Sequence, residues 1–208
     1  MMKESIRDYL PAAGRDWLLP LYDPFVKLFG FDRIREEFVG RSDIRNGHRI
    51  LDIGCGTGTL LIRIKRLFPD VEAGGIDPNA KALRRAIRKS MRAGCSIRYD
   101  RGYSDDLPYP DAYFDRVLSS YVFHHIEAED KTGTLTEIRR VLKPDGVFHM
   151  LDVDFSKKKN KHSNGWYKDN SAPRVLEFLK QSGFADMEIA GRYRTYFTDI
   201  VHYRGVKL

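Results

Sequence analysis

Cysteine is scarce in this chain, whose 208 residues include only Cys55 and Cys95. Two thiols do not make the disulfide framework of a small secreted protein, so the sequence favours a reducing, cytoplasmic setting. The sequence contains no Cys-x-x-Cys pair and no His-Glu-x-x-His run, which excludes the common zinc-binding spacings. We therefore expect no bound metal.

Long apolar runs are also absent. No stretch approaches the roughly 18 apolar residues that a membrane-spanning helix needs, and residues 1–5 do not lead into the apolar core of a secretory signal. Acidic residues are outnumbered, because 29 Asp and Glu face 36 Lys and Arg and give a formal charge of +7. This balance is typical of a soluble protein with a basic surface, and it leaves open an anionic partner such as nucleic acid.

Strand and helix patterns alternate through most of the chain, which predicts an α/β fold with a largely parallel sheet. We expect a single domain over residues 1–208. Its parts are an N-terminal helical cap (1–45), a core (46–154), a polar loop (155–172) and a C-terminal helix with a strand hairpin (173–208). Strands are expected at residues 49–53, 71–76, 96–99, 113–119 and 147–153, helices at 59–68, 79–93, 131–142 and 173–181, and a hairpin turn near 191–194.

The helix expected over residues 79–93 is strongly two-sided. An apolar face is predicted from Ala80, Leu83, Ile87 and Met91, which recur at helical spacing. The cations are expected on the opposite side: Lys81, Arg84, Arg85, Arg88, Lys89 and Arg92. They are typical of a solvated outer face. A track for nucleic acid is the second interpretation, although the helix lacks aromatic residues that stack on bases.

The strongest signal is a glycine-rich turn between an apolar strand and a helix. Asp52 precedes the run Gly54-Cys55-Gly56-Thr57-Gly58. Glycines let a backbone approach a ligand closely, and the helix N-terminus that follows offers N–H groups. Dinucleotide enzymes show Gly-x-Gly-x-x-Gly, but here Thr59 holds the third glycine's place. The carboxylate of Asp52 favours a ligand with an ammonium group, as in a zwitterionic amino acid.

A second acid, Asp77, ends the next expected strand and is followed by Pro78. A carboxylate at that place, about twenty residues beyond the glycines, can bind ribose hydroxyls. Strand, turn, helix, strand and acid occur in a consistent order, which disfavours an ordinary surface turn.

These motifs resemble those of the class I methyltransferases, especially the small-molecule group that includes the ubiquinone/menaquinone biosynthesis enzymes. Residues 51–58 resemble the family's first motif and Asp77 its ribose-binding acid. The later segments that resemble family motifs are residues 106–109 with 114–115, 119–126 and 139–146. The resemblance covers residues 17–153. It implies a Rossmann-like, mostly parallel sheet of seven strands in the order 3-2-1-4-5-7-6, with the seventh antiparallel and helices on both faces.

The resemblance also implies function. The cofactor would be S-adenosyl-L-methionine, with S-adenosyl-L-homocysteine as product, and the methyl acceptor would be a small molecule. A nucleic-acid acceptor is the alternative, favoured by the basic helix and by the cluster from Lys157 to Lys161. A nicotinamide-dependent oxidoreductase and a non-catalytic cofactor-binding protein are further alternatives.

Further site residues follow from the resemblance. The family's adenine-binding Asp is replaced by Tyr103, so adenine contacts would come from the backbone near Tyr103 and Ser104, or from Asp105. Ser120 would contact the methionine end of the cofactor or cap a helix. Tyr22 resembles a tyrosine that some relatives fold over the cofactor's carboxylate, and its other interpretation is a core aromatic.

Two adjacent histidines, His124 and His125, are the candidates for a general base, because imidazole titrates near neutral pH. A structural role for the pair is the more common outcome. A base is needed only if the acceptor must lose a proton, so the catalytic residue is left unassigned.

Overall fold

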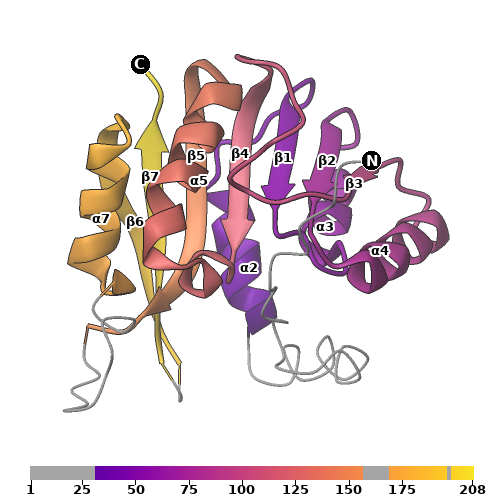
Figure 1. The fold of residues 1–208 in the computed structure, drawn as a ribbon. Coiled ribbons are helices and arrows are strands. Elements are labelled where there is room, and N and C mark those ends of the chain that lie inside the picture. The colour runs from indigo at the N-terminus through magenta and orange to yellow at the C-terminus, as the bar shows by residue number, and fades with distance from the viewer. Residues whose placement is uncertain (1–30, 157–168, 196–197) are drawn as a thin grey trace.

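A computed structural model describes residues 31–156, 169–195 and 198–208 of the chain (Figure 1). Tyr22 and the cluster from Lys157 to Lys161 lie outside the described residues, and so do most of the expected cap and polar loop. No helix in the described ranges is both long enough and apolar enough to cross a membrane.

Seven strands form one sheet in the order β3-β2-β1-β4-β5-β7-β6, which confirms the expected order. The strands β1 to β5 run parallel, and β7 is antiparallel to both of its neighbours. The strands are β1 (Arg49–Ile53), β2 (Glu72–Ile76), β3 (Arg98–Asp100), β4 (Phe114–Ser120), β5 (Leu142–Asp154), β6 (Ala185–Arg194) and β7 (Asp199–Val206).

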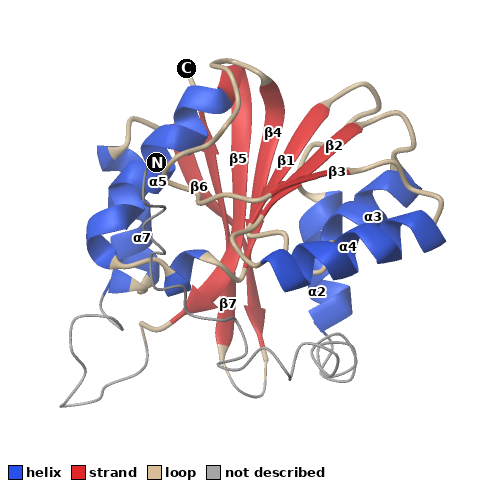
Figure 2. Cartoon of the chain, turned by 45° about the vertical axis from the view of Figure 1, so that its right-hand side comes forward, coloured by secondary structure: helices blue, strands red, loops and turns tan. Residues whose placement is uncertain are grey.

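Helices cover both faces of this sheet (Figure 2). One face carries α2 (Phe31–Gly40), α3 (Thr59–Leu67) and α4 (Ala80–Arg92), and the other carries α5 (Ala128–Val141) and α7 (Ala172–Gln181). A short 3-10 helix, η2 (Phe123–His125), follows β4.

The core is divided by the sheet, because neighbouring residues of a strand point to opposite faces. In β1, Ile50 packs with the cluster under α2, α3 and α4, whereas Leu51 packs with the cluster under α5 and α7. The same alternation separates Leu118 from Val117 in β4. The strands are buried on both sides, which explains why they appear in the sequence as continuous apolar runs.

The apolar face predicted for α4 is wrong for two of its members, because Ile87 is 44% exposed and Met91 is 76% exposed. The buried residues of this helix are Ala82, Leu83, Ala86 and Ser90. The reason is a close approach: a Cβ at Gly58 would lie 3.0 Å from the Cβ of Ala86. Small side chains let α4 lie against the glycine loop, and the larger ones are turned outward.

One expected turn and the start of one expected strand also differ. The turn predicted near 191–194 lies within β6, where a register shift between Ile189 and Gly191 marks a bulge, and the chain reverses between Arg194 and Asp199. Glycine inside a strand commonly marks such a bulge. The strand expected at residues 147–153 begins earlier, as β5 at Leu142, and includes an irregularity at Asp145, whose φ is 59°.

A histidine pair lies in the buried part of the sheet. His149 on β5 and His202 on β7 are both 0% exposed, and their Nδ1 and Nε2 atoms lie 3.0 Å apart. The ring of His202 also packs edge-on against Phe38 at 4.8 Å. Burial lowers the pKa of His202 to about 4 and lowers that of His149 well below its usual value, so both rings are neutral at pH 7.

The pair makes the fold sensitive to acid. In the unfolded chain both histidines titrate near 6.5, whereas in the folded chain they resist protonation, so the free energy of unfolding falls as the pH drops from about 6.5 toward 4. The slope is at most about 1.4 kcal/mol per pH unit for each histidine. His202→Leu should make this slope shallower in urea unfolding. An unchanged slope would contradict the assignment.

Candidate functional site

Three loops meet at the carboxyl edge of the sheet. The strand β1 lies between β2 and β4, and all three run parallel, so their carboxyl ends share one edge. The strand order changes direction at β1, and open α/β sheets bind ligands at such a switch point. Asp52, Asp77 and Ser120 all lie there, at or just beyond the ends of these strands.

The carboxylate of Asp77 fastens the glycine loop to the end of β2. Its Oδ2 accepts a hydrogen bond from the N–H of Gly56 at 2.9 Å, and its Oδ1 accepts one from the N–H of Asn79 at 2.8 Å. Burial raises the pKa of Asp77, while these two donors oppose the rise. Each carboxylate oxygen accepts more than one hydrogen bond, so Asp77 retains the capacity to bind ribose hydroxyls.

Asp52 and Arg35 bring a carboxyl group and a guanidinium group to the same place. Asp52 is 2% exposed, and its Oδ1 has no hydrogen-bond partner among the described residues. Burial raises the pKa of Asp52 to about 8, and the nearby charge of Arg35 opposes this rise. Arg35, on α2, is 7% exposed, and its Nε also lacks a partner within the described ranges. An ammonium group and a carboxylate would satisfy these two atoms, so the pair fits the amino-acid end of S-adenosylmethionine.

Two glycines of the loop have different surroundings. A side chain at Gly58 would collide with Tyr99 and Ala86, so this glycine is required for packing. A Cβ at Gly56 would meet no atom within 4 Å, although its φ of +53° is in the left-handed region. The open side of the loop at Gly56 is therefore where a ligand can approach the backbone.

The threonines of the loop are held by α4. Thr57 is buried, and Lys89 Nζ donates to Thr59 Oγ1 at 2.6 Å and to Thr57 Oγ1 at 3.2 Å. Lys89 therefore does not belong to the solvated face on which the sequence pattern placed it. Cys55, in the same loop, is buried, and burial raises the pKa of its thiol, so it is not a reactive nucleophile.

The segment expected to bind adenine lies beside the end of β2. Arg101 Nε donates to the carbonyl of Pro78 at 3.2 Å, which places the chain leading to Tyr103 and Asp105 next to Asp77. The Ser104 hydroxyl lies 3.0 Å from that of Thr134 on α5. The segment thus lies near the carboxyl edge of the sheet, and the Ser104 side chain is also hydrogen-bonded to the neighbouring helix.

His124 and His125 follow β4 on η2, but they have different surroundings. Both carboxylate oxygens of Asp152 bind His124: one pairs closely with its Nδ1, and the other accepts from its N–H at 3.0 Å. The side chains of His124 and Asp152 are 13% and 3% exposed. No carboxylate in the described part of the chain pairs with His125 in this way, and burial, aided by His124, lowers the pKa of His125 to about 4.

A buried lysine fixes the loop that carries these histidines. Lys131, on α5, is 1% exposed, and its Nζ donates to the carbonyl of Phe123 at 2.8 Å and to Asn170 Oδ1 at 2.7 Å. Burial lowers the pKa of Lys131 to about 8. The lysine therefore connects η2 to the segment that precedes α7.

Sequence reasoning missed Arg35, Asp152 and Lys131. A signal existed for Arg35, because it lies on the helical stripe of Ile34 and Phe38, where a cation is unusual. No local pattern marked Asp152 as the partner of a histidine 28 residues away. Among the described residues, no group of three His, Cys, Asp or Glu side chains is placed to hold a metal ion.

Comparison with known proteins identifies the family. The family described as "Methyltransferase domain" matches residues 50–146. Residues 50–146 form a class I, S-adenosylmethionine-dependent methyltransferase domain. This methyltransferase domain includes the glycine loop, Asp77, His124 and His125. S-adenosylmethionine is the cofactor of the family.

The methyltransferase domain has relatives of known name. The ubiquinone/menaquinone biosynthesis C-methyltransferase UbiE of Bordetella avium is 33% identical over 146 residues, covering 69% of this chain and 56% of the relative. The 27-O-demethylrifamycin SV methyltransferase of Amycolatopsis mediterranei is 36% identical, covering 58% and 44%. This chain thus spans about half the length of these relatives. An S-adenosylmethionine-dependent methyltransferase from Aquifex aeolicus shares the fold, with a TM-score of 0.68, 18% identity and coverage of 88% and 92%.

Two glycine substitutions test which side of the glycine loop contacts the ligand. Gly56→Ala and Gly47→Ala both place a Cβ in open space at positive φ, so each should cost about 1–2 kcal/mol of stability. Only Gly56→Ala should also weaken binding of S-adenosylhomocysteine, by tenfold or more, because its methyl group enters the ligand's side of the loop. Calorimetry and urea unfolding measure the two effects. Equal affinity in both variants would contradict this placement.

Proposed function

We propose that this protein transfers the methyl group of S-adenosylmethionine to a small organic molecule. The observation that carries the proposal is the set of unsatisfied and acidic groups around one glycine loop, namely Asp52, Arg35 and Asp77. Together they match a ligand with an ammonium group, a carboxylate and a ribose. A nicotinamide dinucleotide has no amino-acid end, so this charge arrangement does not favour the oxidoreductase alternative.

Bound S-adenosylmethionine supplies an electrophilic methyl group on a sulfonium, and the chain's residues bind and orient it. Asp52 would accept from the ammonium group and Arg35 would donate to the carboxylate. Asp77 would accept from the ribose hydroxyls while it keeps its bonds to Gly56 and Asn79. Holding both reactants in place contributes up to about 7–11 kcal/mol in favourable systems.

His124 is the general base in this proposal. The close pair with Asp152 makes Nδ1 the protonated nitrogen, which leaves Nε2 as the basic one. Asp152 also stabilises the imidazolium that forms when an acceptor hydroxyl or ring carbon loses its proton. His125 is the weaker candidate, because a group whose pKa is about 4 takes up few protons at neutral pH.

A small-molecule acceptor is favoured over a nucleic acid by two considerations. The two relatives described above carry the names of a quinone-biosynthesis and a rifamycin methyltransferase. The exposed side of α4 carries Ile87 and Met91 rather than aromatic residues that could stack on bases.

The acceptor class can be tested by offering the protein tritiated S-adenosylmethionine with a naphthohydroquinone, a phenol or total RNA. Label in the organic extract supports the proposal, and label confined to precipitated RNA would overturn it.

We also propose that the enzyme works in the cytoplasm. Cys55 and Cys95 are free cysteines, as a reducing compartment allows.

Cofactor affinity should depend on pH through Asp52. Its pKa near 8 means that below pH 8 the carboxyl is mostly protonated, and it must release a proton to bind an ammonium group. The affinity for S-adenosylhomocysteine should therefore rise with pH between about 6 and 8, by up to about tenfold per unit. Asp52→Asn should bind weakly at every pH. Calorimetry across this range provides the measurement, and a flat wild-type profile would contradict the role.

The two histidines form a matched pair of variants. With an acceptor that must lose a proton, His124→Gln should lower kcat by roughly a hundredfold or more, because the base is lost. His125→Gln should stay within a few fold of the wild type. Equal losses in both variants would show that the histidines act by packing.

A further inference from the structure

The exposed side of α4 combines apolar and cationic side chains. The large apolar residues exposed in the described part of the chain are Leu67, Ile87, Met91 and Leu208, and two of these four lie on α4. Ile87 and Met91 are one helical turn apart and therefore on the same stripe. Arg84 and Arg88 occupy the same stripe, since positions i, i+3, i+4 and i+7 of a helix face one way. We call Arg84, Ile87, Arg88 and Met91 the outer stripe of α4.

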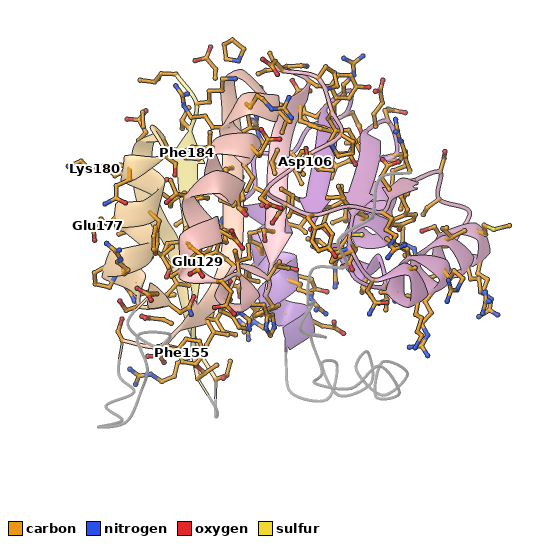
Figure 3. The ribbon with its side chains drawn as sticks, in the orientation of Figure 1. Asp106, Glu129, Phe155, Glu177, Lys180 and Phe184 are labelled. Atoms are coloured by element: carbon orange, nitrogen blue, oxygen red, sulfur yellow. The ribbon has the colours of Figure 1, made fainter. Side chains whose placement is uncertain are left out.

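The outer stripe of α4 is not the side by which this helix packs on the domain. The helix is attached to the domain by its small residues on the opposite side, with Ala86 against Gly58 and Ser90 hydrogen-bonded to Tyr99 at 2.8 Å. Neither Arg84 nor Arg88 makes an ion pair or hydrogen bond through its side chain to another described residue. Figure 3 shows nitrogen-tipped side chains that project from α4 away from the sheet. These groups are therefore available to a partner.

The charge on α4 itself is of one sign. The helix contains no acidic residue between Ala80 and Arg92. A cavity of about 720 Å³ adjoins it between α2, α3 and α4. Its lining adds Arg66 and Arg92 to the basic surface, together with one acid, Asp32, and with Arg63, which is paired with Glu36. Leu67 lines the same cavity, so it lies near Arg92 and extends the apolar part of the surface.

We infer that the outer stripe of α4 docks the protein on an anionic phospholipid surface. Arginines attract the phosphates of the headgroups. Ile87 and Met91 stand between the arginines, where they enter the boundary between headgroups and acyl chains. A nucleic acid would use the cations but not the aliphatic side chains, because bases stack on aromatic rings. The combination of both therefore selects a lipid surface.

The test is sedimentation of the full chain with vesicles of phosphatidylcholine alone or mixed with phosphatidylglycerol. The wild type should bind only the mixed vesicles. Arg88→Glu should weaken this binding by roughly fivefold or more, as expected for removal of one surface cation. The double variant Ile87→Ser, Met91→Ser should weaken it several-fold without changing the charge. Circular dichroism and binding of S-adenosylhomocysteine should match the wild type in every variant, which separates this inference from the proposed function.

Two controls match these variants elsewhere on the surface. Lys180→Glu makes the same reversal of charge as Arg88→Glu, but on α7, which lies on the opposite face of the sheet (Figure 3). Leu208→Ser removes an exposed apolar side chain outside α4. Both should bind mixed vesicles within twofold of the wild type. The inference is overturned if the wild type does not sediment with mixed vesicles, or if Lys180→Glu loses as much as Arg88→Glu. It is also overturned if the Ile87, Met91 double variant binds normally, or if single-stranded RNA is bound in place of vesicles.

Discussion

The hydrogen bonds of one buried carboxylate organise the carboxyl edge of the sheet. Asp77 receives the N–H of Gly56 from the loop after β1 and the N–H of Asn79 at the start of α4. It therefore joins two βα units that are separate in sequence. The orientation of the glycine loop, the position of α4 and the distance between Asp77 and Asp52 all depend on this junction. A charge buried so deeply is tolerated because backbone donors satisfy it.

The central architecture was predictable because its signals are local. The strand over residues 49–53, the glycine loop and the helix beginning at Thr59 agree with the structure nearly residue for residue. A buried strand, a turn that needs glycine and a helix start all leave marks within a few positions. The positions of Asp52 and Asp77 at the ends of β1 and β2 were predictable for the same reason, since each follows buried residues of its strand.

What the sequence concealed depends on contacts between distant residues. The pattern of α4 contains two apolar stripes, and only the close contact with Gly58 determines that the stripe of small residues is buried. His124 and His125 are equivalent in the sequence, and Asp152 distinguishes them from another strand. Arg35 lies among the buried apolar residues of α2. Its proximity to Asp52 is therefore seen only when α2 is placed beside β1.

The direction of β7 has a practical consequence for handling the protein. Because β7 runs antiparallel to β5, the chain leaves the sheet at the edge opposite to the glycine loop (Figure 1). The N–H of Lys207 bonds to the carbonyl of Gly146 there, at the amino-terminal end of the parallel strands. An affinity tag or fluorescent reporter attached after Leu208 would thus be held remote from the ligand, so immobilisation through that terminus suits surface-based binding assays.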